Sequence, residues 1–512
     1  MLSKIYTTSL LGLEGSVITV ETDTASGMVS FFMVGLPDAA VREAKERVSA
    51  AMKNNGFTFP VQKVTINLAP ADVKKEGTYF DLPIAVGILA SSGQIYATEP
   101  LSEYIILGEL SLDGSIKGVK GILPMVLSAL KHGYRKFILP KENAVEALLA
   151  GEGTVYAADN LYAVVEHLCT KRKIEPFSAD LSELFQQKIF YDLDMSDVKG
   201  QETVKRAMEI AAAGGHNMLM IGPPGSGKTM LARRFPTILP DMSREESLDV
   251  TKIYSVAGLL KSEMPLITQR PFRSPHHTVS NIALVGGGRI PKPGEVSLAH
   301  NGVLFLDEFA EFQTSALETL RQPIEDKTVT ISRVNASVTY PAAFTVMASM
   351  NPCPCGYYNN PTHVCHCTQS AIDRYLQKIS GPIIDRIDMI VQVNVENYEK
   401  LNTSCSANET SSQIKQRVDQ ARAVQSERLR GRNIYCNAQM SSKELDEFCV
   451  LDEDGKVLMK NAFDRYRMSA RSYHRILKLA RTIADLEGEF SVGCVHLSEA
   501  LQYRGLDKKY FR

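Results

Sequence analysis

"MLMIGPPGSGKTMLARRF", residues 218–235, decides the fold of this chain. A short apolar, strand-like segment precedes the pattern G-x-x-x-x-G-K-T, and a helical pattern follows it. In that context the glycines let backbone N–H groups curl around phosphate oxygens at the start of a helix. Lys228 is expected to reach the β- and γ-phosphates of a nucleotide, and Thr229 to offer its hydroxyl to Mg²⁺. The stretch predicts an α/β P-loop fold with these nucleotide-binding residues: Gly222, Pro223, Pro224, Gly225, Ser226, Gly227, Lys228 and Thr229.

Two later strand ends supply polar side chains for the same site. "GVLFLDEF", 302–309, is typical of a buried strand that is followed by two acids. Asp307 is predicted to hold the metal, and Glu308 to polarise the attacking water as general base. "FTVMASMN", 344–351, ends at Asn351, whose amide can orient that water near the γ-phosphate. Alone, each segment is more typical of an ordinary strand end, but after a P-loop they predict an ATPase with ATP and Mg²⁺ as cofactors.

Four of the nine cysteines lie in one short segment. "NPCPCGYYNNPTHVCHCT", 351–368, has the spacing C-x-C-x9-C-x-C and also contains His363 and His366. Four thiolates can close a tetrahedral zinc site that pins a loop without a core of its own. Free thiols in a surface loop and a redox pair are the alternatives, because C-x-C is tighter than the usual structural spacing. The candidate zinc ligands are Cys353, Cys355, Cys365 and Cys367.

The bulk composition excludes several classes of protein. The net charge of -1 gives no global basic field, so any nucleic-acid site must be local. No apolar run approaches the roughly twenty residues that span a bilayer, and the acidic start of the chain does not resemble a signal peptide. The chain has nine cysteines, which is an odd number, and the five outside residues 351–368 are scattered. This usage suits a reducing compartment better than a disulfide framework. We therefore expect a cytoplasmic protein with no membrane partner.

The chain length of 512 residues predicts several domains. Residues 1–170 alternate strand and helix patterns, 171–190 form a charged and polar connector, and 191–400 form a second α/β block. Residues 401–412, rich in Ser, Asn and Thr, are typical of a linker, and the remainder of 401–512 is helical by pattern. The expected architecture is α/β and multidomain.

Three long blocks carry a family resemblance: "GGGRIPKPGEVSLAHNGVLFLDEF", "LRQPIEDKTVTISRVNASVTYPAAFTVMASMNP" and "RYLQKISGPIIDRIDM". They resemble the Mg-chelatase-like AAA+ ATPases of the ComM/YifB group. The resemblance implies an AAA+ core with a helical C-terminal lid, a hairpin at about 328–342 before the third strand, and an insert at about 281–297. It also implies a hexameric ring. Arg386 matches the arginine finger that reaches a neighbour's γ-phosphate, and Arg471 matches the arginine that the lid offers in cis. A surface salt bridge is the alternative for each, and Arg475 lies one turn after Arg471.

The N-terminal block resembles a Lon-protease-like (ribosomal S5 domain 2-like) domain through "GTYFDLPIAVGILAS" and "GELSLDGSIKGVKGILPMVLSALKHGYRKFILPKEN". Lon-type peptidases use a serine that a lysine deprotonates. No serine occurs from Gly77 to Leu89, and the lysine position falls near Leu123. We therefore expect a non-catalytic domain, which argues against an ATP-dependent protease.

Basic residues gather in "FDRYRMSARSYHRILKLARTI", 463–483, and in "SERLRGRN", 426–433. Such faces can bind a phosphate backbone, but solvated charge and intersubunit contacts are more common. The DNA partner is implied by the resemblance: ComM-like proteins are motors that drive branch migration of recombination intermediates when transforming DNA is integrated. A Mg-chelatase-like chaperone that remodels a protein or metal-insertion partner is the alternative, and a regulatory ATPase remains open.

Overall fold

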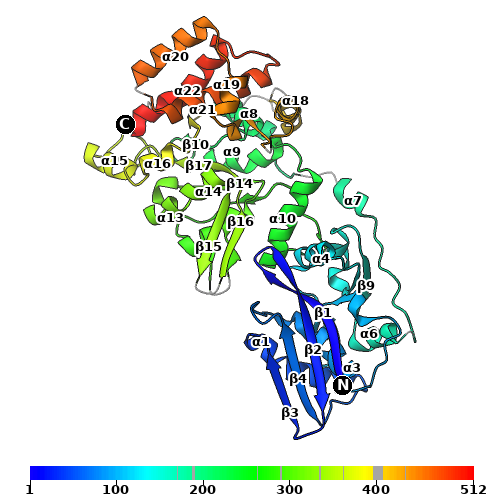
Figure 1. The fold of residues 1–512 in the computed structure, drawn as a ribbon. Helices are drawn as coiled ribbons and strands as arrows, with labels where there is room; N and C mark the ends of the chain where they lie inside the picture. Colours follow the sequence, from blue (N-terminus) through cyan, green and yellow to red (C-terminus); the bar gives the residue numbers. More distant parts are fainter. Residues whose placement is uncertain are drawn as a thin grey trace. The chain divides into compact units, whose positions relative to one another are not determined.

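The computed structural model describes residues 1–169, 171–186, 191–261, 263–288, 291–333, 336–360, 363–395, 408–432, 434–466 and 468–511 (Figure 1). The chain forms two compact units. The first consists of Met1–Lys188 and Arg244–Thr268, and the second of Ile189–Ser243 and Gln269–Arg512. Each unit therefore contains two separate stretches of sequence. No helix among the described residues is long and apolar enough to cross a membrane.

The first unit contains a seven-stranded mixed sheet in the order β3-β4-β2-β1-β5-β8-β9. Its helices lie on both faces, because two separate groups of apolar side chains, one containing α3 and one containing α4, pack against the strands. The strands are β1 (Leu2–Leu11), β2 (Glu14–Ala25), β3 (Ser30–Val34), β4 (Lys63–Ala69), β5 (Tyr104–Ile106), β8 (Lys136–Pro140) and β9 (Thr154–Ala158). The helices are α1 (Ala39–Arg42), α2 (Ala44–Asn54), α3 (Asp81–Ser91), α4 (Ile122–Lys131), α5 (Ala144–Leu148) and α6 (Leu161–Leu168).

Local sequence explains these elements. In β2 the side chains of Ile18, Val20 and Thr22 are buried in alternation, as a strand with one face on the core requires. Helix α3 is apolar on almost every side and nearly all of its residues are buried, because it lies in the core beside β1 and β2. A small hairpin, β6 (Glu109–Leu110) with β7 (Ile116–Lys117), completes this part of the chain.

The segment Arg244–Thr268 belongs to the first unit although it follows the P-loop in sequence. Its helix α10 (Arg244–Ala257) packs on α4, and Ser255 Oγ donates a hydrogen bond to Glu146 Oε1 at 2.5 Å. Glu146 also accepts the backbone N–H of Leu123 at 2.9 Å. Leu123, where the resemblance placed the Lon lysine, is fully buried in a cluster with Leu266. The same cluster includes apolar residues of α7 (Leu181–Gln186), so part of the predicted connector 171–190 is a packed helix.

The second unit contains a five-stranded parallel sheet in the order β11-β14-β17-β10-β18, of which Figure 1 labels β10, β14 and β17. The strands are β10 (Met218–Ile221), β11 (Phe272–Arg273), β14 (Val303–Leu306), β17 (Thr345–Met350) and β18 (Met389–Gln392). Every residue of β10 and β14 is buried, as expected for a sheet that is covered on both faces. The helices before the C-terminal region are α8 (Glu202–Gly214), α9 (Lys228–Arg234), α11 (Asn281–Val285), α12 (Glu295–Leu298), α13 (Thr314–Thr319), α14 (Arg321–Asp326), α15 (Gln369–Leu376) and α16 (Gly381–Ile384).

The structure has one hairpin inside the insert predicted at 281–297 and another at the hairpin predicted at 328–342. The first is β12 (Gly286–Gly287) with β13 (Lys292–Pro293), and the second is β15 (Thr328–Arg333) with β16 (Ala336–Pro341). The tip residues 289–290 and 334–335 lie outside the described part of the chain.

The C-terminal region is helical: α18 (Ser411–Arg428), α19 (Ser442–Phe448), α20 (Glu453–Tyr466), α21 (Ala470–Leu486) and α22 (Cys494–Phe511). Helix α21 packs on α8, so the helices share one apolar core with the P-loop sheet. Of the predicted linker 401–412, residues 401–407 lie outside the described residues. Its last part starts α18, because the Thr410 side chain and Gln413 form a capping box.

Candidate active site

Three strands bring the predicted catalytic residues to one edge of the parallel sheet. The P-loop follows β10, the acidic pair follows β14, and Asn351 follows β17. β17 lies between the other two strands and runs parallel to both. Because the carboxyl ends of parallel strands meet at one edge, side chains more than a hundred residues apart come together there.

Lys228 is held inside the P-loop. Its Nζ donates to the carbonyl oxygens of Gly222 and Pro223, each at 2.8 Å, and lies 3.2 Å from Asn351 Oδ1. Gly225 and Gly227 have φ angles of +74° and +87°, which only glycine adopts without strain. Burial lowers the pKa of Lys228 to about 8, although the Asp307 carboxylate opposes that shift. The arrangement places an ammonium group where an anionic phosphate would offset its desolvation.

The two predicted Mg²⁺ ligands lie next to each other. Thr229 Oγ1 donates to Asp307 Oδ2 at 2.8 Å, and Ser349 Oγ donates to the other carboxylate oxygen of Asp307. A hydroxyl and a carboxylate are hard oxygen ligands, the type that Mg²⁺ prefers in combination with phosphate oxygens and water. The donor set therefore fits Mg²⁺. Ser349 was not predicted, although it lies on β17, two residues before Asn351.

The predicted general base has a histidine partner. Glu308, with a φ of +54°, directs a side chain that is 60% exposed toward His277, whose Nδ1 lies 3.1 Å from Glu308 Oε2. His277 follows β11, the strand that pairs with β14, and its ring also contacts Phe312. Sequence reasoning missed His277, because only the pairing of β11 with β14 places "PHH", 275–277, beside the acidic pair.

The two predicted arginines share one carboxylate. Arg386 Nη2 lies 2.5 Å from Glu325 Oε2, and Arg471 Nη2 lies 3.2 Å from Glu325 Oε1. Arg386 also donates to the carbonyls of Arg321 and Pro382, and it is only 6% exposed. Within the described part of the chain, neither arginine forms a hydrogen bond or ion pair with the P-loop. The structure therefore brings Arg386 and Arg471 together at Glu325 and shows no hydrogen bond or ion pair of either arginine with Asp307, Glu308 or Asn351 in the described part of the chain.

Arg475, the alternative to Arg471 on α21, is a largely buried structural residue. Its Nε lies 3.3 Å from Asp388 Oδ1, and its Nη1 donates to the Ile387 carbonyl. Burial opposes the ionisation of Asp388, but nearby His216 and Arg475 hold its pKa below the ordinary value. Arg471 is 59% exposed, whereas Arg475 is 14% exposed. This difference favours Arg471 over Arg475 as the arginine that can turn to an incoming anion.

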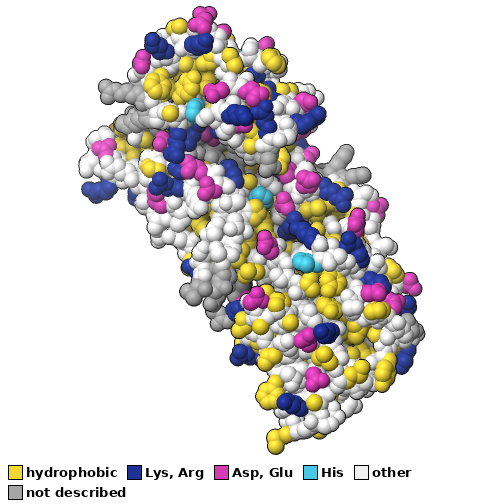
Figure 2. All heavy atoms as spheres, in the orientation of Figure 1, with side chains coloured by type: hydrophobic (Ala, Val, Ile, Leu, Met, Phe, Trp, Pro, Cys, Tyr) yellow, Lys and Arg dark blue, Asp and Glu magenta, His cyan; other side chains and the backbone are white. Residues whose placement is uncertain are grey.

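The other basic residues of these helices are largely paired. Arg428 contacts Asp485, Arg430 contacts Glu427, and Arg432 contacts Glu447. Arg481 also contacts Asp485, and Lys478 donates to the carbonyl of Ala438. Figure 2 shows basic and acidic side chains interspersed over this region. Arg467 lies outside the described residues. The segments 426–432 and 470–483 therefore do not offer a continuous cationic face.

The four predicted zinc ligands converge. The Sγ atoms of Cys353, Cys355, Cys365 and Cys367 all lie within 4.8 Å of one another, and three of the pairs lie 3.3, 3.5 and 3.7 Å apart. All four cysteines are free thiols. The His363 ring lies against the Tyr357 ring at a tilt of 46°, and His363 is not part of the cluster. A tetrahedral Zn–S₄ site with bonds of about 2.3 Å places its sulfurs about 3.8 Å apart, so this donor set fits zinc.

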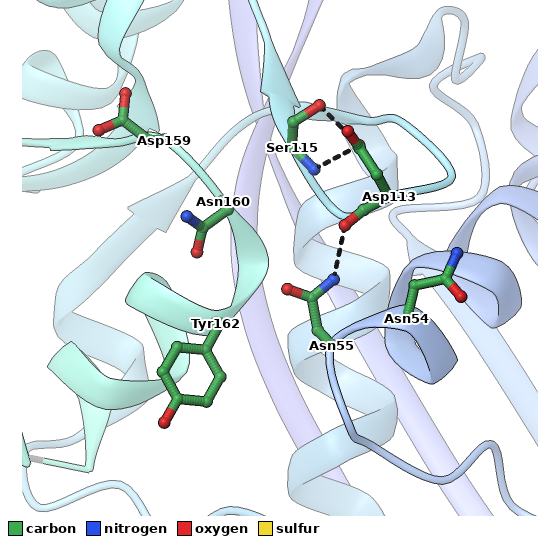
Figure 3. Close-up of a pocket in the computed structure, with 7 residues that line it drawn as sticks. All are labelled: Asn54, Asn55, Asp113, Ser115, Asp159, Asn160 and Tyr162. Carbon is green, nitrogen blue, oxygen red and sulfur yellow. Dashed lines mark hydrogen bonds between the residues drawn. The ribbon is translucent and has the colours of Figure 1, made fainter.

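A polar depression in the first unit does not resemble a catalytic site (Figure 3). Its side chains are used in local structure. Asn55 Nδ2 donates to the carbonyl of Asp113, Ser115 donates to the Asp113 carboxylate, and Asn160 caps α6. The remaining lining residues are Asn54, Asp159 and Tyr162. These contacts stabilise a turn and helix ends, so the nucleotide site remains the candidate active site.

Three family models match the chain: "Magnesium chelatase, subunit ChlI" over residues 194–401, "Subunit ChlI of Mg-chelatase" over 20–143, and "Magnesium chelatase, subunit ChlI C-terminal" over 408–504. Competence protein ComM of Haemophilus influenzae is 42% identical over 511 residues, which cover 99% of this chain and 98% of that protein. YifB of Escherichia coli is 44% identical over 510 residues, with the same coverage of both chains. YifB of Salmonella typhimurium is 42% identical over 508 residues, again with 99% and 98% coverage.

Proposed function

Because this chain belongs to the ComM/YifB family of magnesium-chelatase-like proteins, we propose that it is a ring-forming, ATP-hydrolysing DNA motor. Its expected activity is that of a branch-migration helicase on recombination intermediates during DNA uptake and natural transformation. The family supports the ATPase. The name of the relative ComM, a competence protein, supports the link to DNA uptake.

The ATPase proposal rests on one observation, the convergence of four side chains: Thr229 donates a hydrogen bond to Asp307 at 2.8 Å, and Lys228 lies 3.2 Å from Asn351. With nucleotide bound, the Lys228 ammonium would contact the β- and γ-phosphates instead of the carbonyl oxygens of Gly222 and Pro223. Thr229 and Asp307 would hold Mg²⁺, which when bound neutralises charge on the phosphate oxygens. Asn351 would orient the attacking water, and the Glu308 carboxylate would accept its proton. Ser349 keeps the Asp307 carboxylate in place through its hydrogen bond.

The shared contact with Glu325 supports a site that is completed by a neighbouring subunit. The Glu325 carboxylate occupies the position between two guanidinium groups that a phosphate of a neighbour's nucleotide could take. The family resemblance gives Arg386 the role of a finger in trans. Because Arg471 reaches the same carboxylate, both arginines would serve the neighbour's nucleotide, in contrast to the cis role expected for Arg471. Hydrolysis would then depend on assembly of the homo-hexamer.

The paired hairpins support a DNA contact. Tyr340 Oη donates to the Pro291 carbonyl at 2.8 Å, and a side chain at Gly286 would lie 2.7 Å from Ile331. The two hairpins are therefore packed side by side. Lys292 and Arg333 are exposed near their tips, where cationic groups can contact a phosphate backbone.

Migration of a synthetic mobile DNA junction tests the proposal, with Lys228→Ala protein as the control. We expect strand exchange that requires ATP in the wild-type protein and that is absent in the variant. A wild-type ring that hydrolyses ATP but leaves the junction unmoved would contradict the DNA motor. That result would favour a magnesium-chelatase-like chaperone acting on a protein or metal-insertion partner, as the names of the family models suggest.

A further inference from the structure

We propose that Cys353, Cys355, Cys365 and Cys367 bind one Zn²⁺ ion and that the loaded cluster holds the P-loop in its nucleotide-binding conformation. The inference rests on the proposed ATPase site. It adds a metal that regulates that site without taking part in hydrolysis.

The cluster is built like a structural metal site. The loop between Cys353 and Cys367 contains no helix or strand in its described part, and Cys353 alone among the four is fully buried. Cys353 Sγ also accepts the backbone N–H of Tyr358 at 3.3 Å. A loop without its own core gains little from burying apolar surface, so a shared metal is a physical reason for four sulfurs to converge within 4.8 Å.

The loop contacts the nucleotide site at two points. Cys353 stands two residues after Asn351, which lies 3.2 Å from Lys228 Nζ. On the other side of the cysteine pair, Gly356 adopts a φ of +87°, and a Cβ at this residue would lie only 2.5 Å from Cδ of Pro224. Pro224 is a residue of the P-loop turn itself. The cluster therefore lies beside both the end of β17 and the phosphate-binding backbone.

These contacts predict coupling between metal and nucleotide. Metal bound to Cys353 and Cys355 would fix the backbone between them and the turn at Gly356, and would so hold the segment that supports Pro224 and Asn351. Loss of the metal would let this segment move away from the P-loop. Nucleotide affinity would then fall, and by linkage nucleotide would strengthen metal binding by the same factor.

The test compares wild-type protein as purified, after removal of metal with a chelator, and after reloading with Zn²⁺. Metal content is measured by elemental analysis, and nucleotide affinity by equilibrium binding of a fluorescent ATP analogue, so that no step requires hydrolysis. We expect one zinc per chain and at least about fivefold weaker nucleotide binding without it, which is the lower range of allosteric coupling. Reloading should restore the affinity.

Two variants separate the metal from the contact. Cys365→Ser should lose the metal and bind nucleotide weakly whether or not Zn²⁺ is added, whereas Cys494→Ser, outside the cluster, should behave as wild type. Gly356→Ala should keep its zinc yet bind nucleotide more weakly, because the methyl group would collide with Pro224. Absence of zinc from the wild-type protein would overturn the inference. Equal nucleotide affinity in the loaded, metal-free and Gly356→Ala proteins would also overturn it. Failure of the proposed ATPase is distinct: zinc-loaded wild-type protein would then bind no nucleotide at all.

Discussion

Nδ1 of His277 lies 3.1 Å from Oε2 of Glu308, so the proposed general base has a ring nitrogen as its partner. The contact follows from the sheet, because β11 and β14 run parallel and the chain leaves both strands at the same edge. This contact holds one carboxylate oxygen of Glu308 against the imidazole ring and leaves the second oxygen available to accept a proton from water. His277 is in this respect a positioning residue.

We expect His277→Ala to lower kcat for ATP hydrolysis by about tenfold with little change in KM, since the histidine would act on the base and not on nucleotide binding. His277→Gln, which keeps a hydrogen-bond donor near Glu308, should recover part of the rate. In a Glu308→Gln background, itself reduced by at least about a hundredfold, His277→Ala should have no further effect. Steady-state kinetics of the wild type, the three single variants and the double variant measures this. A rise in KM in parallel with the fall in kcat would contradict the positioning role.

The contact of Arg386 and Arg471 with the same carboxylate predicts that both act across a subunit interface. Lys228→Ala protein lacks a working P-loop but keeps both arginines, whereas Arg386→Ala protein keeps its P-loop. Mixing these two inactive proteins should restore part of the ATPase rate, because a P-loop from one then faces an arginine from the other. The mixture of Lys228→Ala with Arg471→Ala should behave in the same way.

The two mixtures separate trans from cis for each arginine. If Arg471 serves the nucleotide of its own subunit, its mixture stays inactive while the Arg386 mixture recovers. Each variant measured alone at the same total protein concentration is the control, and sizing of the mixture confirms that mixed rings form.

The residues of the nucleotide site could be predicted from sequence because each follows a short apolar strand. Thr229, Asp307 and Asn351 are separated widely in sequence, yet the rule that parallel strands share one carboxyl edge is enough to bring them together. His277 could not be found in this way, since its strand β11 has only two residues and gives no hydrophobic pattern. The domain boundaries remain predictions.

Non-local contacts account for other features that the sequence did not reveal. Helix α10 joins the first unit through the buried Glu146–Ser255 hydrogen bond and the cluster around Leu123. The sequence around residue 250 does not indicate that it packs against residues more than a hundred positions earlier. The sequence of 426–432 shows the basic residues but not the acidic residues that pair with them. The acids that neutralise Arg428 and Arg432 come from α21 and α19, and only the packing of these helices reveals them.

This pairing predicts where DNA is not bound. Arg430→Ala and Arg432→Ala should each change affinity for a branched DNA by less than about twofold, because surface salt bridges contribute little and these guanidinium groups already have carboxylate partners. Lys292→Ala and Arg333→Ala, at the two hairpins, should each weaken DNA binding. Each should also reduce the slope of log affinity against log salt concentration by about one, because one phosphate contact is lost. Titrations at several salt concentrations measure both quantities. Equal losses in all four variants would contradict the assignment of the hairpins.

The largely buried pair of Arg475 and Asp388 predicts a sharp contrast with Arg471 on the same helix. Arg475→Ala leaves the Asp388 carboxylate, which also accepts the N–H of Asn217 at 2.9 Å, without its cationic partner. Breaking a buried ion pair in this way costs about 3–5 kcal/mol of unfolding free energy. Arg471→Ala removes a side chain that is 59% exposed, and such changes usually stay within about 0.5 kcal/mol. Urea unfolding followed in the C-terminal helices should therefore show a large loss for Arg475→Ala and almost none for Arg471→Ala, while ATPase activity is lost in both. Comparable stability of the two variants would mean that Arg475 is not the structural arginine and would reopen the choice between them.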